Sequence, residues 1–441
     1  MENQNARMSE DRLALDGGGP IRDHPLPACQ PGGMVIDVRE KKAVLEVLDN
    51  AAAGGALVRY GRQGHWVERF EQAFADYMGT SFALGLSSGT GALMAALAGL
   101  GVGEPGDEVI VPSYTWIATM GAVVALNAIP VIAEVDDSLT LDPDDFEAKI
   151  TDRTRAVIPV HMRGTPCDMD RIMDVAERHG IPVIEDVAQA CGGTYKGKKL
   201  GTFGDAGMYS LQENKVITCG EGGALITSDE TVYRRAAAFS DHGFTPPRNF
   251  MAITEHTILG VKLAMGEIQG ALAYEQLQKI DDIVSRMRKN HKALIERLGT
   301  PSALEFRRLN DAAGDVGQYL ILYLPDEPTA KIFADALYAE NLYAETPEIP
   351  MLLRDETWHW FPNMRHLIEE RQVARSGQPF KVPTQEEEDS GPRYRADMVP
   401  RSTSYLNRAV RLDLSPELSP RDIDDIVRGV QKLSKVLSTD T

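Results

Sequence analysis

One lysine stands in a notable position in the 441-residue chain, between an apolar run and a glycine-rich turn. In AGMYSLQENKVITCGEGG, residues 206–223, the strand-like AGMYSL is followed by a polar break, and Lys215 comes directly after it. The lysine is either a solvated loop residue or an amine that the fold directs at a reactive group. An amine held in a protein interior can act as a nucleophile and as a proton carrier. Other motifs in the sequence help to decide between these two roles of Lys215.

A carboxylate, Asp186, follows the apolar run IPVIE. Burying a carboxylate at the end of a central strand is unfavourable unless a cation accompanies it, and a protonated pyridine nitrogen is such a cation. The alternative is a helix N-cap, because Gln189 stands three residues later, at capping-box spacing. Only one further strand separates Asp186 from Lys215, so we expect both at the same edge of a sheet.

A third group of residues has the character of a phosphate site. In LSSGTGAL, residues 86–93, small residues open an apolar helix, and Gly89 and Thr90 would offer free N–H groups and a hydroxyl to an anion. The alternative is ordinary capping of a core helix. Ser210 ends the strand before Lys215 and adds a second hydroxyl.

An aromatic residue completes the set. Trp116 follows a strand end in PSYTWIATM, where it can stack on a flat ring or pack in the core. A phosphate cradle, an aromatic plate, a buried carboxylate and a lysine, in this order, are what pyridoxal 5′-phosphate requires. Each element is weak alone, and the ordered set predicts a site for that cofactor.

The elements that must position these residues alternate along the chain. From about 80 to 230, short β-branched runs are separated by helical stretches, which predicts an α/β fold with a large, mainly parallel sheet whose ligands bind at the strands' carboxyl ends. We expect an irregular arm at 1–36, a large cofactor-binding domain at 37–285, and a smaller C-terminal α/β domain at 286–441. Residues 367–400 are polar and proline-rich, which predicts a mobile surface excursion.

Composition excludes several functions. The formal charge of −19 argues against nucleic acid or anionic membrane as partner, and no apolar stretch is long enough to span a bilayer. The four cysteines form no CxxC pair, so we expect no metal site. With no signal-peptide pattern at the N-terminus, we expect a cytoplasmic protein.

The motifs SSGTGAL, PSYTWIAT, IEDVAQACGGTYKGKKLGTFGD and SLQENKVITCGEGG resemble the DegT/DnrJ/StrS sugar aminotransferases, from about residue 55 to the end. The resemblance implies the fold of type I pyridoxal-phosphate enzymes and a homodimer with shared active sites. It implies that Lys215 bonds to the cofactor, that Asp186 holds the pyridine nitrogen and that Gln189 lies near the ring oxygen. The phosphate and the ring would then be held by the remaining residues: Gly89, Thr90, Ser210 and Trp116. Relatives that act as dehydratases carry histidine at the lysine position, so Lys215 favours transamination, with a dehydratase or lyase as the alternative.

One motif departs from the family. Residues 260–265 read GVKLAM where members often read GxNxRM, whose asparagine reaches the phosphate of the neighbouring subunit. Lys262 stands at that position and can still pair with a phosphate as a point charge.

The resemblance implies glutamate or glutamine as amino donor and a keto or aldehyde sugar as acceptor. VHMRG, FSDHG and the Trp-rich 358–366 are similar to the subgroup that aminates C8 of a keto-deoxyoctulosonate, which we favour. A nucleotide-linked keto sugar is a further candidate, and the N-terminal LALDGGGPIRDHPLP is similar to the branch that aminates cyclitols. Arg163 and His242 would face the acceptor, with a structural ion pair as the alternative for Arg163.

Overall fold

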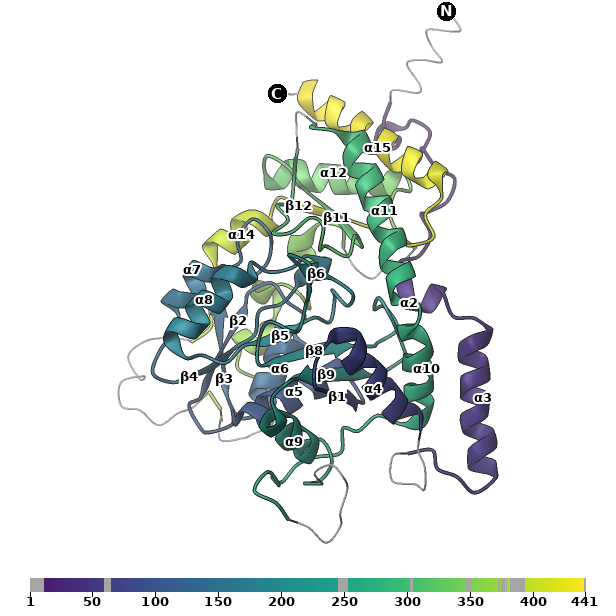
Figure 1. Ribbon diagram of the computed structural model, residues 1–441. Coiled ribbons are helices and arrows are strands. Elements are labelled where there is room, and N and C mark those ends of the chain that lie inside the picture. The colour runs from purple at the N-terminus through teal and green to yellow at the C-terminus, as the bar shows by residue number, and fades with distance from the viewer. Residues whose placement is uncertain are drawn as a thin grey trace, which may run out of the picture.

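The computed structural model describes residues 12–58, 65–244, 253–301, 304–345, 350–371, 373, 377, 379–380 and 393–439. A larger part is built on a twisted sheet, and a smaller part lies above it in Figure 1. The N-terminal end of the described chain lies with the smaller part, as does the C-terminal helix.

The large sheet runs in the order β3-β2-β4-β5-β8-β9-β1, with β4 and β5 joined through the parallel bridges Val157–Val183 and Val160–Asp186. Strand β9 is antiparallel to both of its neighbours, and the other pairings are parallel. The prediction of a mainly parallel α/β sheet is therefore confirmed. The strands are β1 (Phe82–Leu86), β2 (Glu108–Pro112), β3 (Ile129–Ala133), β4 (Thr154–Val157), β5 (Ile184–Asp186), β8 (Ala206–Ser210) and β9 (Gly223–Thr227).

Helices cover both faces of this sheet. One core cluster gathers residues of α5, α6 and α9, and a second gathers residues of α4, α8 and α10. Helix α4 ends where Gly79 takes the left-handed conformation, φ 75°. The helices are α4 (Trp66–Met78), α5 (Gly89–Leu100), α6 (Ala118–Ala125), α7 (Pro143–Ala148), α8 (Met169–His179), α9 (Glu230–Phe239) and α10 (Glu267–Leu277).

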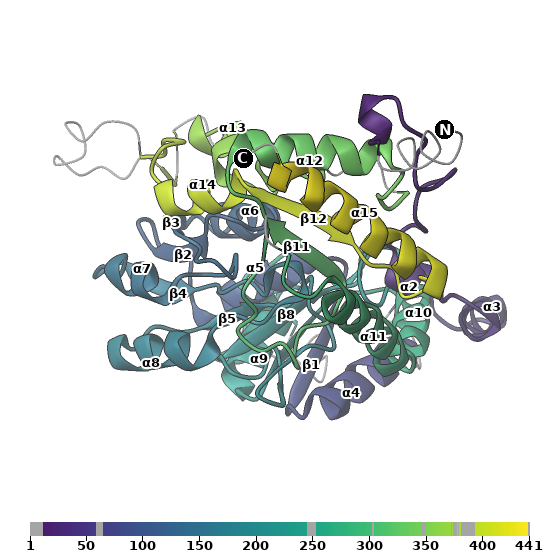
Figure 2. The same cartoon turned by 90° about the horizontal axis from the view of Figure 1, so that it is seen from above.

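The smaller part has an antiparallel sheet, β10-β11-β12, covered by helices α12 and α15 (Figure 2). Strand β11 is its central strand. Helix α11 joins the two parts, since Ile283 and Met287 pack in a core of the large part and Leu294 and Leu298 in that of the small part. The elements are β10 (Glu305–Phe306), β11 (Tyr319–Tyr323), β12 (Ala409–Asp413), α11 (Ile280–Leu298), α12 (Glu327–Ala339) and α15 (Pro420–Thr439).

The N-terminal arm is irregular but firmly packed. It contains the short η1 (Ala14–Asp16) and α2 (Pro31–Met34), and it buries Leu13, just before η1, and Leu26 in the core of the small part. Helix α3 (Val38–Ala52) then starts with a capping box, in which Asp37 and Glu40 each accept a backbone N–H. Residues 1–11 of the expected arm lie outside the described residues.

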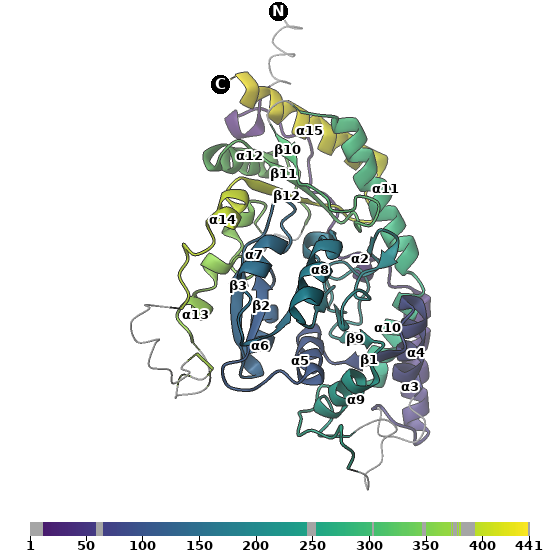
Figure 3. The ribbon, with the colours of Figure 1, turned by 60° about the vertical axis from the view of Figure 1, so that its left-hand side comes forward.

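The described ends of the segment 367–400 pack onto the large part. Leu367, Phe380, Tyr394 and Val399 are buried in its core, and the Tyr394 hydroxyl donates to the carbonyl of Pro130 at 2.8 Å. Helices α13 (Arg365–Ile368) and α14 (Pro400–Leu406) lie on the side where β3 is the edge strand (Figure 3). Residues 381–392 lie outside the described residues.

The described residues lack two kinds of feature: a membrane-spanning helix and a metal-binding cluster. None of their helices combines the length and the hydrophobicity that crossing a membrane needs. Nor do they contain a cluster of three or more histidine, cysteine or acidic side chains placed to hold a metal ion.

The core beneath β8 gives a test of stability. Phe74 is fully buried, with its ring centroid 5.4 Å from that of Phe70 and 4.9 Å from that of Tyr209. Phe74→Ala should lower the free energy of unfolding by about 3–5 kcal/mol, because it leaves a cavity between aromatic rings. Urea denaturation measures this. Ile332→Ala, at a half-exposed position on α12, is the control and should change it by less than about 1 kcal/mol.

Candidate active site

A cavity of about 630 Å³ opens at the carboxyl ends of β2, β5 and β8. Residues of the small part, from Gln318 to His359, line its other side. Most of the residues that the sequence singled out meet in it: Gly89, Thr90, Trp116, Arg163, Asp186, Gln189, Ser210 and Lys215.

Asp186 is the last residue of β5 and is buried. Its Oδ2 accepts from the Thr119 hydroxyl and its Oδ1 from the backbone N–H of Ala188, each at 3.0 Å. Burial raises the pKa of Asp186, whereas these two hydrogen bonds and the charge of Lys215 act in the opposite direction. A turn follows it, so the carboxylate does not cap a helix. A cation bound in the cavity would stabilise this carboxylate.

Lys215 follows β8 after a short turn, in which its N–H donates to the carbonyl of Gln212. Desolvation lowers the pKa of Lys215 to about 8; Asp186 raises it and Arg163 lowers it further. A substantial fraction of the amine is therefore uncharged near neutral pH, which is the form that attacks carbonyl carbon.

The N-terminus of α5 forms the anion end of the cavity. Ser88 caps the helix by accepting the N–H of Gly91 at 3.0 Å. The helix N-terminus is therefore capped and also lines the cavity, so the two alternatives are compatible. A Cβ on Gly89 would lie 2.8 Å from the Cβ of Ser210, and one on Gly223 would lie 2.4 Å from the carbonyl oxygen of Ser88. Only glycine fits these close approaches, which leave backbone N–H groups and the Ser210 hydroxyl at the cavity wall.

Trp116 stands at the rim and is 44% exposed. The residues on either side of it bond to the small part: the N–H of Thr115 donates to the carbonyl of His359 at 2.9 Å, and that of Ile117 donates to the carbonyl of Trp358 at 2.8 Å. The ring centroids of Trp116 and His359 lie 4.9 Å apart. Burial, with the charges of Arg163, Arg411 and Lys215, holds the pKa of His359 well below its usual range, so this imidazole is neutral.

Arg163 lines the cavity but its guanidinium is engaged. Nη2 donates to Glu356 at 2.6 Å and Nε to the hydroxyl of Tyr114 at 3.1 Å. Glu356, 1% exposed, also accepts from the Tyr114 hydroxyl and pairs with Arg411. The backbone N–H of Arg163, at φ 54°, donates to the amide oxygen of Gln189. The ion pair left open as the alternative for Arg163 is therefore present.

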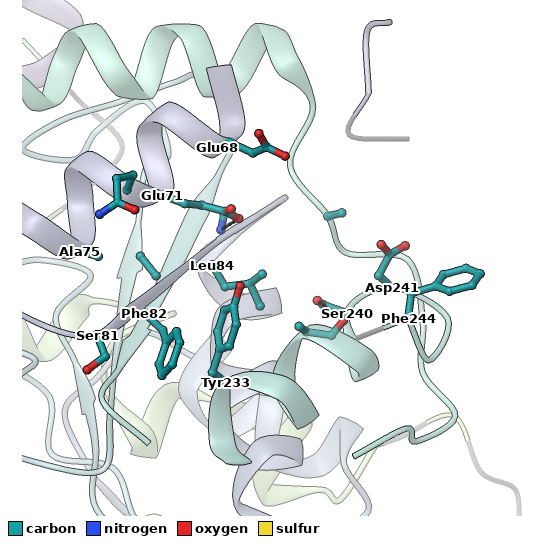
Figure 4. Close-up of a pocket in the computed structure, with 15 residues that line it drawn as sticks. Glu68, Glu71, Ala75, Ser81, Phe82, Leu84, Tyr233, Ser240, Asp241 and Phe244 are labelled. Carbon is teal, nitrogen blue, oxygen red and sulfur yellow. Dashed lines mark hydrogen bonds between the residues drawn. The ribbon is translucent and has the colours of Figure 1, made fainter. Parts of the chain in front are cut away.

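Two predicted site residues lie elsewhere. His242 is exposed in the turn after α9, and Lys262 pairs with Asp241 at 2.8 Å. Asp241 lines a separate cavity of about 480 Å³ together with Glu68 and Glu71 of α4 (Figure 4). Within one chain, neither residue reaches the cavity of Lys215.

The chain is similar in sequence to known proteins. The DegT/DnrJ/EryC1/StrS aminotransferase family matches residues 36–351. The chain belongs to this family. It is 36% identical over 345 residues to the L-glutamine:2-deoxy-scyllo-inosose aminotransferase of Streptomyces kanamyceticus, covering 74% of this chain and 76% of that one. It is 40% identical over 258 residues to the GDP-perosamine synthase of Caulobacter vibrioides, covering 58% and 66%.

Solved structures of this type extend over nearly the whole chain. DesI, determined in the presence of its TDP-sugar product, is 26% identical with a TM-score of 0.73, covering 97% of this chain and 98% of that one. The 3-amino-5-hydroxybenzoic acid synthase, at 23% identity and a TM-score of 0.74, covers 95% and 100% and shares the fold. The protein is thus an aminotransferase of the type I pyridoxal-phosphate fold, and its cofactor is pyridoxal phosphate.

The residues of the cavity also fit pyridoxal phosphate when they are considered without the comparisons. A phosphate suits the glycine-backed N-terminus of α5, a pyridinium suits the buried Asp186, and an aldehyde suits the amine of Lys215. These positions agree with the roles that the family resemblance implies.

Sequence reasoning missed several cavity residues. Thr119 lines the cavity three residues after Trp116, and Tyr114 bonds to Arg163; their polar side chains in an apolar stretch were a usable signal. His359 lies in the Trp-rich segment 358–366, which was noted only for its similarity to one subgroup, and Glu356 lies two residues before that segment.

The ionisation of Lys215 can be measured in the cofactor-free aminotransferase. Competitive acetylation, read by mass spectrometry of the Lys215 peptide, should rise with pH through a midpoint near 8. In Asp186→Asn the midpoint should fall, because the carboxylate that stabilises the ammonium is gone. An unchanged or higher midpoint would contradict this pairing.

The close approach at Gly89 gives a second test. Gly89→Ala should weaken binding of pyridoxal phosphate about 10- to 100-fold, since crowding of about 1–3 kcal/mol would fall on the phosphate cradle. Gly121→Ala on α6, where a Cβ would meet nothing within 4 Å, is the matched control. Fluorescence titration with the cofactor distinguishes the two, and equal affinities would count against the cradle.

Proposed function

We propose that the protein transfers the amino group of L-glutamine or L-glutamate to the keto group of a sugar or cyclitol. The observation that carries this proposal is the pairing of Asp186 with Lys215 in one cavity, where the amine has a lowered pKa. A lysine in this position also distinguishes the chain from relatives in which histidine supports dehydration.

Different side chains of the protein have different roles in the proposed reaction. Pyridoxal phosphate, when bound, supplies an electrophilic carbonyl and an electron-withdrawing ring. Lys215 Nζ takes a proton from the amino-bearing carbon of the donor and later delivers a proton to the acceptor carbon. Asp186 keeps the ring nitrogen protonated, and the N–H groups of α5 with Ser210 bind the phosphate. Trp116 and the neutral His359 exclude water from one side of the cavity.

For the acceptor we favour an uncharged keto-cyclitol, in place of the octulosonate that the sequence motifs favoured. Trp358 is 52% exposed at the cavity and offers a flat apolar face, and the guanidinium of Arg163 is already neutralised by Glu356. An acceptor carboxylate or pyrophosphate would have to compete with Glu356 for it. The relatives that act on scyllo-inosose compounds support the same choice. Octulosonate-type and nucleotide-linked keto sugars are the competing classes.

A second copy of the chain belongs to this proposal. His242 and Lys262 lie away from the cavity of their own chain. Their predicted contacts with acceptor and phosphate require a homodimer in which each subunit contributes to its neighbour's site. Lys262 would then divide its charge between Asp241 and the phosphate.

The half-reaction with the donor tests the activity first. Adding L-glutamine or L-glutamate to the holoenzyme should convert the absorbance of the aldehyde form of the cofactor to that of the amine form. Lys215→Ala should slow this by about 10²–10⁴-fold, because the proton carrier is lost. A holoenzyme whose spectrum neither amino acid changes would sink the proposal.

The acceptor is tested separately, with the amine form of the enzyme. A keto-inositol, an 8-oxo-octulosonate and a nucleotide-linked keto sugar should be compared, with the amine product read by mass spectrometry. We expect the highest kcat/KM with the keto-inositol. Turnover of a charged acceptor alone would overturn the cyclitol assignment and leave aminotransfer standing, whereas a deoxygenated product without amine would indicate a dehydratase.

A further inference from the structure

The N-terminal arm reaches the back of the active-site cavity. Three of its residues, within four positions of one another, contact three residues of the cavity wall. The amide of Gln318 donates to Cys29 Sγ at 3.7 Å, and the amide of Gln30 donates to Asn214 Oδ1 at 3.0 Å. The backbone N–H of Gly32 donates to the carbonyl oxygen of Lys215 itself at 3.1 Å.

Gly32 packs so tightly against the segment after Lys215 that no larger residue fits there. A Cβ at this position would lie 2.8 Å from the backbone nitrogen of Thr218 and 2.9 Å from the carbonyl carbon of Ile217. These are backbone atoms of the strand-to-turn segment that follows Lys215, so they cannot rotate away. The arm and the lysine loop are therefore fitted backbone to backbone.

Hydrogen bonds inside the loop are short-range. The N–H of Lys215 donates to the carbonyl of Gln212, the N–H of Asn214 to the side chain of Gln212, and the N–H of Gln212 to Ser210 Oγ at 3.4 Å. Such bonds set the local turn, but they do not fix its position relative to the sheet. Contacts from outside the loop fix it: the N–H of Thr218 bonds to Gln276 Oε1 on α10 at 3.3 Å, and Gln30 and Gly32 hold the residues around Lys215 from about 180 residues away.

The arm is itself anchored on both sides of these contacts. Arg22 pairs with Asp422 at 2.7 Å and Asp425 at 2.9 Å on α15, and Leu26 forms a parallel bridge with Ala344. After the contacts, Glu40 of α3 accepts from Gln276 at 2.8 Å and pairs with Lys279. The arm thus has a fixed path from the small part to the lysine loop.

We propose that residues 29–32 are positioning residues for the reaction: they hold Lys215 at the depth in the cavity where its amine reacts. This proposal rests on the assignment of Lys215 as the reactive amine. It predicts that displacing the arm opens the back of the cavity, hydrates the amine and returns its pKa toward that of an ordinary lysine.

Two neighbouring glycines of α2 make a matched pair for the test. Gly32→Ala forces the arm off the lysine loop, whereas a Cβ on Gly33 would meet only ordinary contacts, 3.7 Å from Gln30 Cβ and 3.8 Å from Glu213 O. The charged groups near Lys215, which are Asp186, Arg163 and Glu221, are unchanged in both variants.

The measurement is competitive acetylation of Lys215 in the cofactor-free full-length chain. In Gly32→Ala the midpoint should rise by at least about one pH unit, a tenfold change in the protonation equilibrium. In Gly33→Ala it should match the wild type. The affinity for pyridoxal phosphate should fall about tenfold in Gly32→Ala only.

If Gly32→Ala does not fold, Gln30→Ala replaces it, because it removes only an exposed side-chain hydrogen bond. Its midpoint should move in the same direction by a smaller amount. A folded Gly32→Ala, or a Gln30→Ala in its place, that titrates like the wild type would overturn the proposal. Since the readout needs neither donor nor acceptor, a failure of aminotransfer in the wild type is distinguishable from a failure of this inference.

Discussion

The buried carboxylate at the end of β5 needs hydrogen-bond donors and a nearby cation, and the rest of the site supplies them. Asp186 loses its hydration there, and an isolated buried carboxylate is unstable unless donors and cations replace the water. The Thr119 hydroxyl, the N–H of Ala188 and the charge of Lys215 replace it in part. A protonated ring nitrogen completes the compensation. The Asp186 carboxylate, which destabilises the cofactor-free protein, therefore contributes to the affinity for the cofactor. The position of β5 between β4 and β8 gives this carboxylate its depth.

The smaller part of the chain lines one side of the cavity. Glu356 holds Arg163 and Arg411 together with the hydroxyl of Tyr114, so two guanidinium groups share one buried carboxylate. Backbone hydrogen bonds from Thr115 and Ile117 to the same segment bring the two parts into contact beside Trp116. The electrostatic character of this side of the cavity is thus set by residues that belong to neither the phosphate cradle nor the lysine loop.

The sequence was informative wherever a residue's role depends on its immediate neighbours. Lys215 and Asp186 each follow an apolar strand, and a parallel sheet brings such ends to one edge, so their meeting in one cavity was predictable. The cavity positions of His359 and Gln318 were not predictable, because they follow from packing across the two parts of the chain. The arm shows the same limit: its proline and glycine content indicated an irregular path, but the fit of Gly32 against Ile217 and Thr218 is visible only in three dimensions. For Arg163, both readings were open in the sequence, and its contact with Glu356 shows the ion pair.

The cover of strand β3 has a consequence for how the protein is made. This edge strand receives its outer packing from a segment near the end of the chain, where Tyr394 donates to Pro130 and Ser402 bonds to Ser113 and to the N–H of Val135. A ribosome therefore releases most of the sheet long before its last apolar cover is synthesised. Until then the nascent chain carries an unprotected parallel edge, the kind of surface that pairs with other chains and that chaperones shield.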